Sequence, residues 1–202
     1  MHKFNRTLAT KWNENYFSKP YFLWKNCADD EMVQKFIDVG ESIEATDAKV
    51  GGGVAESKLV ESVRISKLSW IHHNEKSKEL FDFIVDKVDR INYWHYGMHL
   101  DSMESIQYTR YPIGGHYKFH NDIVVRNDPI MRKMSLVLAL TDDNEYEGGD
   151  FLLMPHGDNP ERIRFKKGEL IAFPSWIPHK VEPITSGHRI TAVTWIYGPK
   201  FV

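Results

Sequence analysis

The chain has 202 residues, of which 42% are hydrophobic and 27% charged, and a formal net charge of −2. This is the composition of a globular protein of about one domain. The sequence has no block of five or six like charges and no apolar run near the ~20 residues that cross a bilayer, so neither a nucleic-acid nor a membrane partner is expected. With Cys27 as its only cysteine and no apolar export segment at its start, the chain is expected to be cytoplasmic.

Two amphipathic helices are expected in the first hundred residues. Asp29-Asp30-Glu31 provides acidic capping residues, apolar residues follow at spacings of three to four, and Gly40 is expected to end the first helix. The second helix is expected over about 75–91 and should pack on the outside of a sheet. Its apolar face comprises Leu80, Phe81, Ile84, Val85, Val88 and Ile91.

The segments around these helices are less regular. A flexible loop is expected over 42–58, because Gly51-Gly52-Gly53 lacks the GKS or GKT sequence of a phosphate-binding loop. A strand is expected at Val63–Ile71. The aromatic cluster Tyr93, Trp94 and Tyr96 is expected to pack in the core, with a contribution to a substrate groove as the alternative.

After about residue 98 the chain changes to short β-type runs separated by turn residues. Such spacing predicts two sheets rolled face to face. The expected strands are Ile106–Arg110, Tyr117–Val125, Ser135–Leu140, Phe151–Met154, Arg162–Phe165, Leu170–Phe173, Lys180–Glu182 and Arg189–Tyr197. Glu147-Gly148-Gly149-Asp150 is expected to form a tight hairpin.

The predicted fold class is α+β but mainly β. It is a double-stranded β-helix of the jelly-roll or cupin type, with N-terminal helices packed outside. We expect one domain over residues 1–202, in which about 1–100 form the helical and strand support and about 104–199 form the jelly-roll core.

His120-Asn121-Asp122 is a candidate metal-binding pair. Side chains alternate along a strand, so His120 and Asp122 would point to the same face and, if that face is inward, converge inside the roll. Taken alone, this pattern more often reflects chance or a hydrogen-bonded pair.

A third candidate ligand, His179, precedes a predicted turn across Pro183–Gly187. If that hairpin is centred near Ile184, His179 and Arg189 are cross-strand neighbours. Alternation then places Arg189, Thr191, Val193 and Trp195 on one face, so that a cation, a hydroxyl and an aromatic ring lie beside the third ligand.

Two histidines and one carboxylate on one side of a metal are typical of non-haem Fe(II) oxygenases. The open metal positions would accept a chelating 2-oxo acid and O₂. Arg189 could then bind the distal carboxylate of that acid through charge-assisted hydrogen bonds, which Thr191 could share. The alternative for Arg189 is a surface salt bridge with Glu182 or Asp150.

Several ordered motifs resemble a known family, the prolyl 4-hydroxylase-like 2-oxoglutarate/Fe(II) dioxygenases. They are Tyr111-Pro-Ile-Gly-Gly-His-Tyr117-Lys-Phe-His120-Asn-Asp122, Tyr146-Glu-Gly-Gly-Asp150-Phe, Lys167-Gly-Glu-Leu-Ile-Ala-Phe-Pro-Ser175, His179-Lys-Val-Glu-Pro183 and Gly187-His-Arg189. The bacterial PKHD-type hydroxylases look closest, since they share stretches like Val63–Ile71 and Arg132–Leu138. The resemblance covers roughly residues 63–199.

The resemblance implies a role for each matching residue. His120, Asp122 and His179 match the Fe(II) ligands, and Arg189 matches the residue that pairs with the C5 carboxylate of 2-oxoglutarate. Tyr111 matches a tyrosine that hydrogen-bonds this co-substrate, and Thr191 and Ser135 lie at suggestive positions near it. Tyr117 matches a tyrosine near iron and substrate, and Trp195 matches an aromatic residue near the site.

The expected function is therefore 2-oxoglutarate-dependent hydroxylation of an unactivated C–H, with O₂ consumed and succinate and CO₂ released. The resemblance favours a prolyl residue of a peptide or protein as substrate and ascorbate as a reductant. A small molecule or free amino acid is the alternative substrate. A non-catalytic cupin-like metal-binding or sensing module is the alternative of another class.

Overall fold

The computed structural model describes residues 19–49, 60–123 and 129–200. Its helices, as far as the chain is described, are α1 (Asp30–Glu41), α2 (Lys78–Ile91) and a π-helical turn, η3 (Asn92–Tyr96), that continues α2. No helix in these ranges is both long and apolar enough to cross a membrane.

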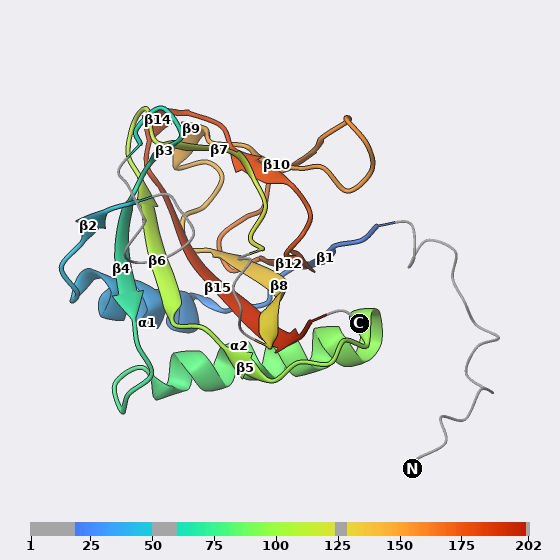
Figure 1. Ribbon diagram of the computed structural model, residues 1–202. Coiled ribbons are helices and arrows are strands. Elements are labelled where there is room, and N and C mark those ends of the chain that lie inside the picture. The colour runs from blue at the N-terminus through green and yellow to red at the C-terminus, as the bar shows by residue number, and fades with distance from the viewer. Residues whose placement is uncertain (1–18, 50–59, 124–128, 201–202) are drawn as a thin grey trace, which may run out of the picture.

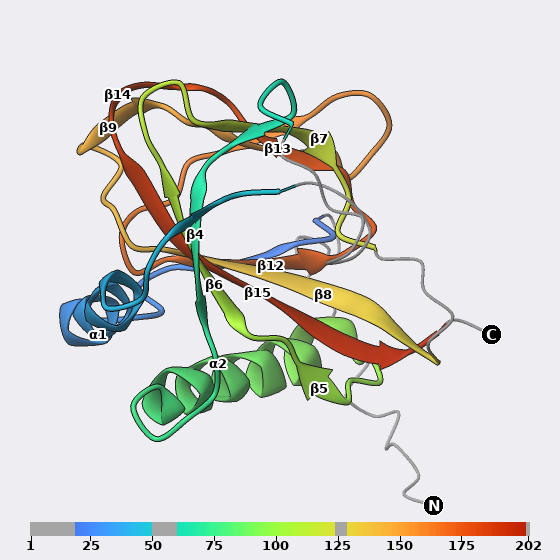
Figure 2. The same ribbon diagram turned by 60° about the vertical axis from the view of Figure 1, so that its left-hand side comes forward.

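The strands form one large sheet, one smaller sheet and a separate strand pair. The large sheet has the order β1-β12-β8-β15-β6-β4-β2, with β5 also paired to β15. The smaller sheet has the order β11-β10-β13-β7-β3, and β14 pairs with β9. Figures 1 and 2 show the large sheet between the helices on one side and β7, β13, β9 and β14 on the other.

The large sheet is made of β1 (Phe22–Trp24), β2 (Thr46–Asp47), β4 (Lys67–Ile71), β5 (Ser102–Met103), β6 (Ile106–Tyr111), β8 (Ile130–Ala139), β12 (Leu170–Pro174) and β15 (Arg189–Pro199). The remaining strands are β3 (Arg64–Ile65), β7 (His116–His120), β9 (Tyr146–Gly148), β10 (Phe151–Leu153), β11 (Glu161–Ile163), β13 (His179–Val181) and β14 (Ile184–Gly187).

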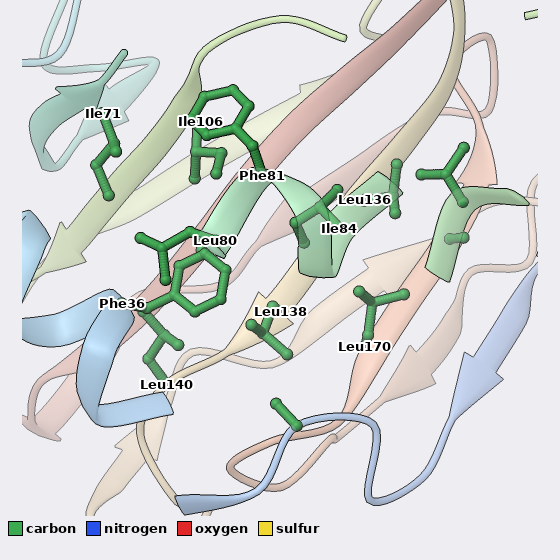
Figure 3. Close-up of a cluster of buried hydrophobic side chains, with 14 of the residues drawn as sticks. Phe36, Ile71, Leu80, Phe81, Ile84, Ile106, Leu136, Leu138, Leu140 and Leu170 are labelled. Atoms are coloured by element: carbon green, nitrogen blue, oxygen red, sulfur yellow. The ribbon is translucent and has the colours of Figure 1, made fainter. Parts of the chain in front are cut away.

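Two hydrophobic clusters account for these layers. One lies between the helices and the large sheet, where Leu80 and Ile84 of α2 pack with Leu136 and Leu138 of β8 (Figure 3). The other lies inside the roll and includes Phe173 of the large sheet. Alternate side chains of β8, β12 and β15 enter opposite clusters, so these strands contribute apolar side chains to the core from both faces. The predicted mainly-β jelly roll with helices outside is confirmed.

The first helix begins as predicted but does not end as predicted. The Asp29 carboxylate caps α1 by accepting a hydrogen bond from the Met32 backbone N–H at 2.8 Å. Gly40, however, lies within the helix rather than after it. A Cβ at Gly40 would lie 2.4 Å from the Tyr108 ring, so this glycine permits close helix–sheet contact rather than ending the helix.

The second helix is shorter than predicted, and Val85 is 46% exposed rather than part of the apolar face. The predicted core position is also wrong for Tyr93 and Trp94, which are both 73% exposed on η3. Tyr96 is half-buried, and its hydroxyl donates to the Ala172 carbonyl at 2.9 Å.

Two predicted strands have different boundaries that matter for the site. The expected strand Val63–Ile71 is interrupted at Ser66, so β3 joins the smaller sheet and β4 joins the large one. The strand expected over Tyr117–Val125 ends at His120, and 124–125 lie outside the described residues, as do Gly51-Gly52-Gly53. The expected turn Pro183–Gly187 contains a further strand, β14.

Candidate active site

Three potential metal ligands converge at one end of the smaller sheet. His120 ends β7 and His179 begins β13, and the two are direct partners across this strand pair. Asp122 lies two residues beyond β7, where its backbone N–H donates to the Ser175 carbonyl at 2.8 Å. One ligand atom from each of the three side chains lies within 4.8 Å of the others. The convergence is as predicted, although Asp122 reaches it from a loop and not by strand alternation.

Both imidazoles are oriented by hydrogen bonds to the backbone. His120 Nδ1 lies 2.8 Å from the Lys118 carbonyl, and His179 Nδ1 lies 3.0 Å from the Ile177 carbonyl. Since a carbonyl only accepts, each Nδ1 carries the proton and each Nε2 offers a lone pair. The two Nε2 atoms face Asp122 at 3.6 and 3.4 Å. Three electron-pair donors thus meet without a proton between them, which suits a divalent cation.

The surroundings keep His120 and Asp122 in the protonation states that bind metals. Burial and the nearby His179 lower the pKa of His120 to about 3. Burial alone would raise the pKa of Asp122, but the two neighbouring imidazoles and the Ser135 hydroxyl hold it below the usual value. Ser135 Oγ donates to Asp122 Oδ2 at 2.7 Å and lies 3.0 Å from Ser175 Oγ.

The predicted hairpin between His179 and Arg189 is wrong. β13 pairs with β10 and β7, whereas β15 pairs with β6, β8 and β5, so the two residues lie in different sheets. The chain between them forms β14, which pairs with β9 instead. The cross-strand partner of Arg189 is Tyr111 on β6. Two facing sheets, and not one hairpin, therefore carry the two residues.

Arg189 is buried at 3% exposure without a carboxylate partner among the described residues. Its Nη2 and the Oγ1 of Thr191 are buried polar atoms that lack a hydrogen-bond partner. The alternative salt bridges are excluded, because Asp150 pairs with Arg162 and Arg164, and Glu182 pairs with Lys180.

Aromatic rings connect Arg189 with the triad through the interior of the roll. The Arg189 guanidinium lies 5.5 Å from the ring centroids of both Tyr111 and Phe165. Phe165 is 6.0 Å from Phe151, and Phe151 is 5.6 Å from His179. The predicted alternation along β15 holds, since Val193 packs in this interior cluster while Ala192 packs on the helix side.

The other predicted site residues also lie near the triad. The Tyr117 ring stacks on His120, with centroids 3.5 Å apart and planes at 18°. Trp195 is buried, and the Arg132 guanidinium lies 3.8 Å from its ring. Arg132 in turn forms two hydrogen bonds of 2.9 Å with the Glu104 carboxylate. Ser135 contacts Asp122, where its hydroxyl orients a candidate ligand.

Three residues near the triad were not singled out from the sequence. Ser175 touches both Ser135 and the Asp122 backbone, Glu104 holds Arg132, and Arg64 is buried over Tyr117 with its guanidinium 4.5 Å from the ring. The sequence does not indicate that Arg64 is buried, because Arg64 occupies a polar position in an apparently regular strand. The one feature that could have drawn attention to it is its place in the PKHD-like stretch Val63–Ile71.

Residues 106–197 match the family model described as the 2OG-Fe(II) oxygenase superfamily. The resemblance to 2-oxoglutarate/Fe(II) oxygenases is confirmed. The chain is 34% identical to a PKHD-type hydroxylase of Stutzerimonas stutzeri over 91 residues, which are 43% of this chain and 40% of the relative. A PKHD-type hydroxylase of Alteromonas mediterranea is 35% identical over 94 residues, 44% and 41% of the two chains. The match thus spans about two fifths of these curated relatives.

Solved structures of this oxygenase type share the fold along nearly the whole chain. A prolyl-4-hydroxylase of Pseudomonas putida superposes with a TM-score of 0.71 at 18% identity, covering 93% of this chain and 97% of the other. A prolyl hydroxylase of Trichoplax adhaerens, in complex with a hypoxia inducible factor peptide fragment, gives 0.73 at 19% identity, covering 95% and 89%. At this identity the likeness establishes the fold alone.

Proposed function

We propose that this oxygenase-type chain is an Fe(II)- and 2-oxoglutarate-dependent dioxygenase that hydroxylates an unactivated C–H bond, with succinate and CO₂ as co-products. His120, Asp122 and His179 would hold the iron, and Arg189, Tyr111 and Thr191 would hold 2-oxoglutarate. Ascorbate would serve as the reductant that restores Fe(II).

The observation that carries this proposal is the pair of buried, unpaired groups on β15 beside a convergent ligand set. A buried guanidinium without a counter-ion is costly unless a ligand supplies one. The C5 carboxylate of 2-oxoglutarate would accept its charge-assisted hydrogen bonds, and the Thr191 hydroxyl could donate to the same group. A simple metal-binding or sensing module has no need for this second anion site.

When bound, the iron supplies activation of O₂ at the open positions of a facial triad. The protein's own residues perform the remaining tasks. Backbone carbonyls fix the imidazole tautomers, Ser135 orients Asp122, and Arg189 orients the co-substrate from the opposite sheet. The aromatic residues Tyr117 and Trp195 would restrict which C–H bond comes close and exclude water.

A prolyl residue of a peptide or protein is the substrate we favour. It is supported by the PKHD-type relatives and by the prolyl hydroxylase fold neighbours, one of which is in complex with a peptide fragment. A free amino acid or other small molecule is the second candidate.

The proposal is tested by adding Fe(II) and 2-oxoglutarate to the protein without oxygen. A weak visible charge-transfer band of an iron-chelated 2-oxo acid is expected, and Asp122→Ala should abolish it. Asp89→Ala, which removes an exposed carboxylate from α2, should retain it. Absence of the band in the wild type at saturating metal and co-substrate would overturn the cofactor assignment.

A further inference from the structure

Two arginines are buried among the described residues, Arg189 at 3% exposure and Arg64 at 7%. Neither forms an ion pair with a carboxylate in the part of the chain that the structure describes. The first is explained by the co-substrate of the proposed reaction. Arg64 carries a buried charge without a counter-ion among the described residues, and the proposed reaction gives this charge no role.

The hydrogen-bond partners of the Arg64 side chain among the described residues are neutral. Its Nε donates to Ser66 Oγ at 2.8 Å, and its Nη2 donates to Gln107 Oε1 at 3.0 Å. These bonds orient the guanidinium but leave its charge uncompensated, because neither partner is an anion. A guanidinium has five N–H donors, so donors remain for a further partner.

Arg64 lies beside the metal-binding residues. It is the cross-strand partner of Tyr117, and its guanidinium lies 4.5 Å from the centroid of that ring. The same ring stacks on His120 at 3.5 Å. The buried charge is thus separated from a candidate iron ligand by a single aromatic ring.

Arg132, another arginine at this site, is neutralised by a carboxylate of the protein itself and therefore needs no ligand as counter-ion. Its guanidinium lies over Trp195, and the Glu104 carboxylate binds it through two hydrogen bonds of 2.9 Å. Arg132 is paired with an acid, whereas Arg64 has no acidic partner among the described residues. The exposed Lys118 next to Tyr117 likewise forms no ion pair with a described residue, so it adds a second positive charge on this side of Tyr117.

We propose that Arg64 is the anchor for a carboxylate of the substrate, so that the enzyme prefers substrates with an acidic group next to the hydroxylated residue. Arg189 and Arg64 would then bind one carboxylate each, of the co-substrate and of the substrate respectively. This inference rests on the proposed dioxygenase function. The carboxylate could belong to an acidic side chain of a peptide or to the α-carboxylate of a free amino acid, and the recognition chemistry is the same.

The test compares substrates that differ only in the carboxylate. One series consists of proline-containing peptides with Glu or Gln at each position flanking the proline, and the other pairs free proline with prolinamide. Succinate formed above the uncoupled baseline, and one added oxygen atom in the product by mass spectrometry, give kcat/KM for each member. The carboxylate member of one series should be preferred about 10-fold or more, the usual strength of a charge-assisted hydrogen bond.

Arg64→Gln should reduce that preference to near unity, and Arg64→Lys should retain part of it. Arg90→Gln, which removes an exposed charge from α2, should leave the preference unchanged. If Arg64 only holds Tyr117 against His120, its replacement would slow both members of a pair equally and leave their ratio intact.

Failure of the proposed dioxygenase function can be distinguished from failure of the proposed role of Arg64. If the wild-type protein shows no anaerobic charge-transfer band with Fe(II) and 2-oxoglutarate, the dioxygenase function is contradicted. A wild type that shows the band but turns over no carboxylate member, or shows no preference for the carboxylate member in either series, contradicts the role of Arg64. The series that gives the preference identifies the source of the carboxylate.

Discussion

Replacing Arg189 by methionine should weaken 2-oxoglutarate binding without destabilising the metal-free protein. Arg189 is 3% exposed, has no carboxylate partner among the described residues, and has a buried Nη2 without an acceptor. A charge-assisted hydrogen bond contributes about 1.5–3 kcal/mol, so loss of a two-bond contact should cost about 3–6 kcal/mol. The dissociation constant should then rise on the order of 10²- to 10⁴-fold.

The same change removes a buried, uncompensated charge from the metal-free protein. Exchange of such a charge for an apolar side chain of similar length is often neutral or stabilising, so the free energy of unfolding should not fall. The assays are a 2-oxoglutarate titration of the anaerobic Fe(II) band and urea unfolding of the metal-free chain. Arg90→Met should change neither by more than about 0.5 kcal/mol. A large loss of stability with unchanged 2-oxoglutarate affinity would refute the reasoning.

Three further changes test the metal site and the core. Ser135→Ala removes the hydroxyl that donates to the Asp122 carboxylate, and Co(II) affinity should fall about 10- to 100-fold in a direct titration; an unchanged affinity would contradict this role. Because the folded-state pKa of His120 is depressed to about 3 from 6.5, stability of the metal-free protein should be lost as the pH falls from 6.5 toward 3, and His120→Gln should flatten that slope in urea unfolding. Phe173→Ala, at a fully buried position, should cost about 3–5 kcal/mol of unfolding free energy, whereas Trp94→Ala on the exposed π-helical turn should cost less than about 0.5 kcal/mol.

The layers of this fold could be predicted because they depend on local periodicity. The apolar spacing of α2 indicates one buried face, and the short runs after residue 98 indicate strands whose two faces enter different clusters. The predicted convergence of His120, Asp122 and His179 is also found. Its basis is different, because Asp122 is held by a backbone hydrogen bond to Ser175, which lies in the turn after β12 and is distant in sequence.

The position of Arg189 could not be derived from local sequence. Hairpin geometry assumes that consecutive strands pair, but in this roll β14 pairs with β9, and β15 pairs with β6 and β8. Burial is equally non-local. Tyr93 and Trp94 are aromatic and exposed, whereas Arg64 is charged and buried, because β3 leaves the line of β4 and places Arg64 over Tyr117.

Gly148 and Gly149 are a sequence feature that results from pairing between strands distant in sequence. The predicted tight hairpin is wrong, because β9 and β10 pair with other strands and not with each other. Both glycines have positive φ, and a Cβ at Gly149 would lie 2.2 Å from Ile184 and 3.4 Å from the Arg189 stem. A Cβ at Gly148 would lie 2.3 Å from the Pro183 carbonyl. The glycines therefore let the β9–β10 connection pack against β14 and Arg189. Glycine is required here because there is no space for a side chain beside the proposed anion site. A turn pattern in the sequence does not reveal this requirement.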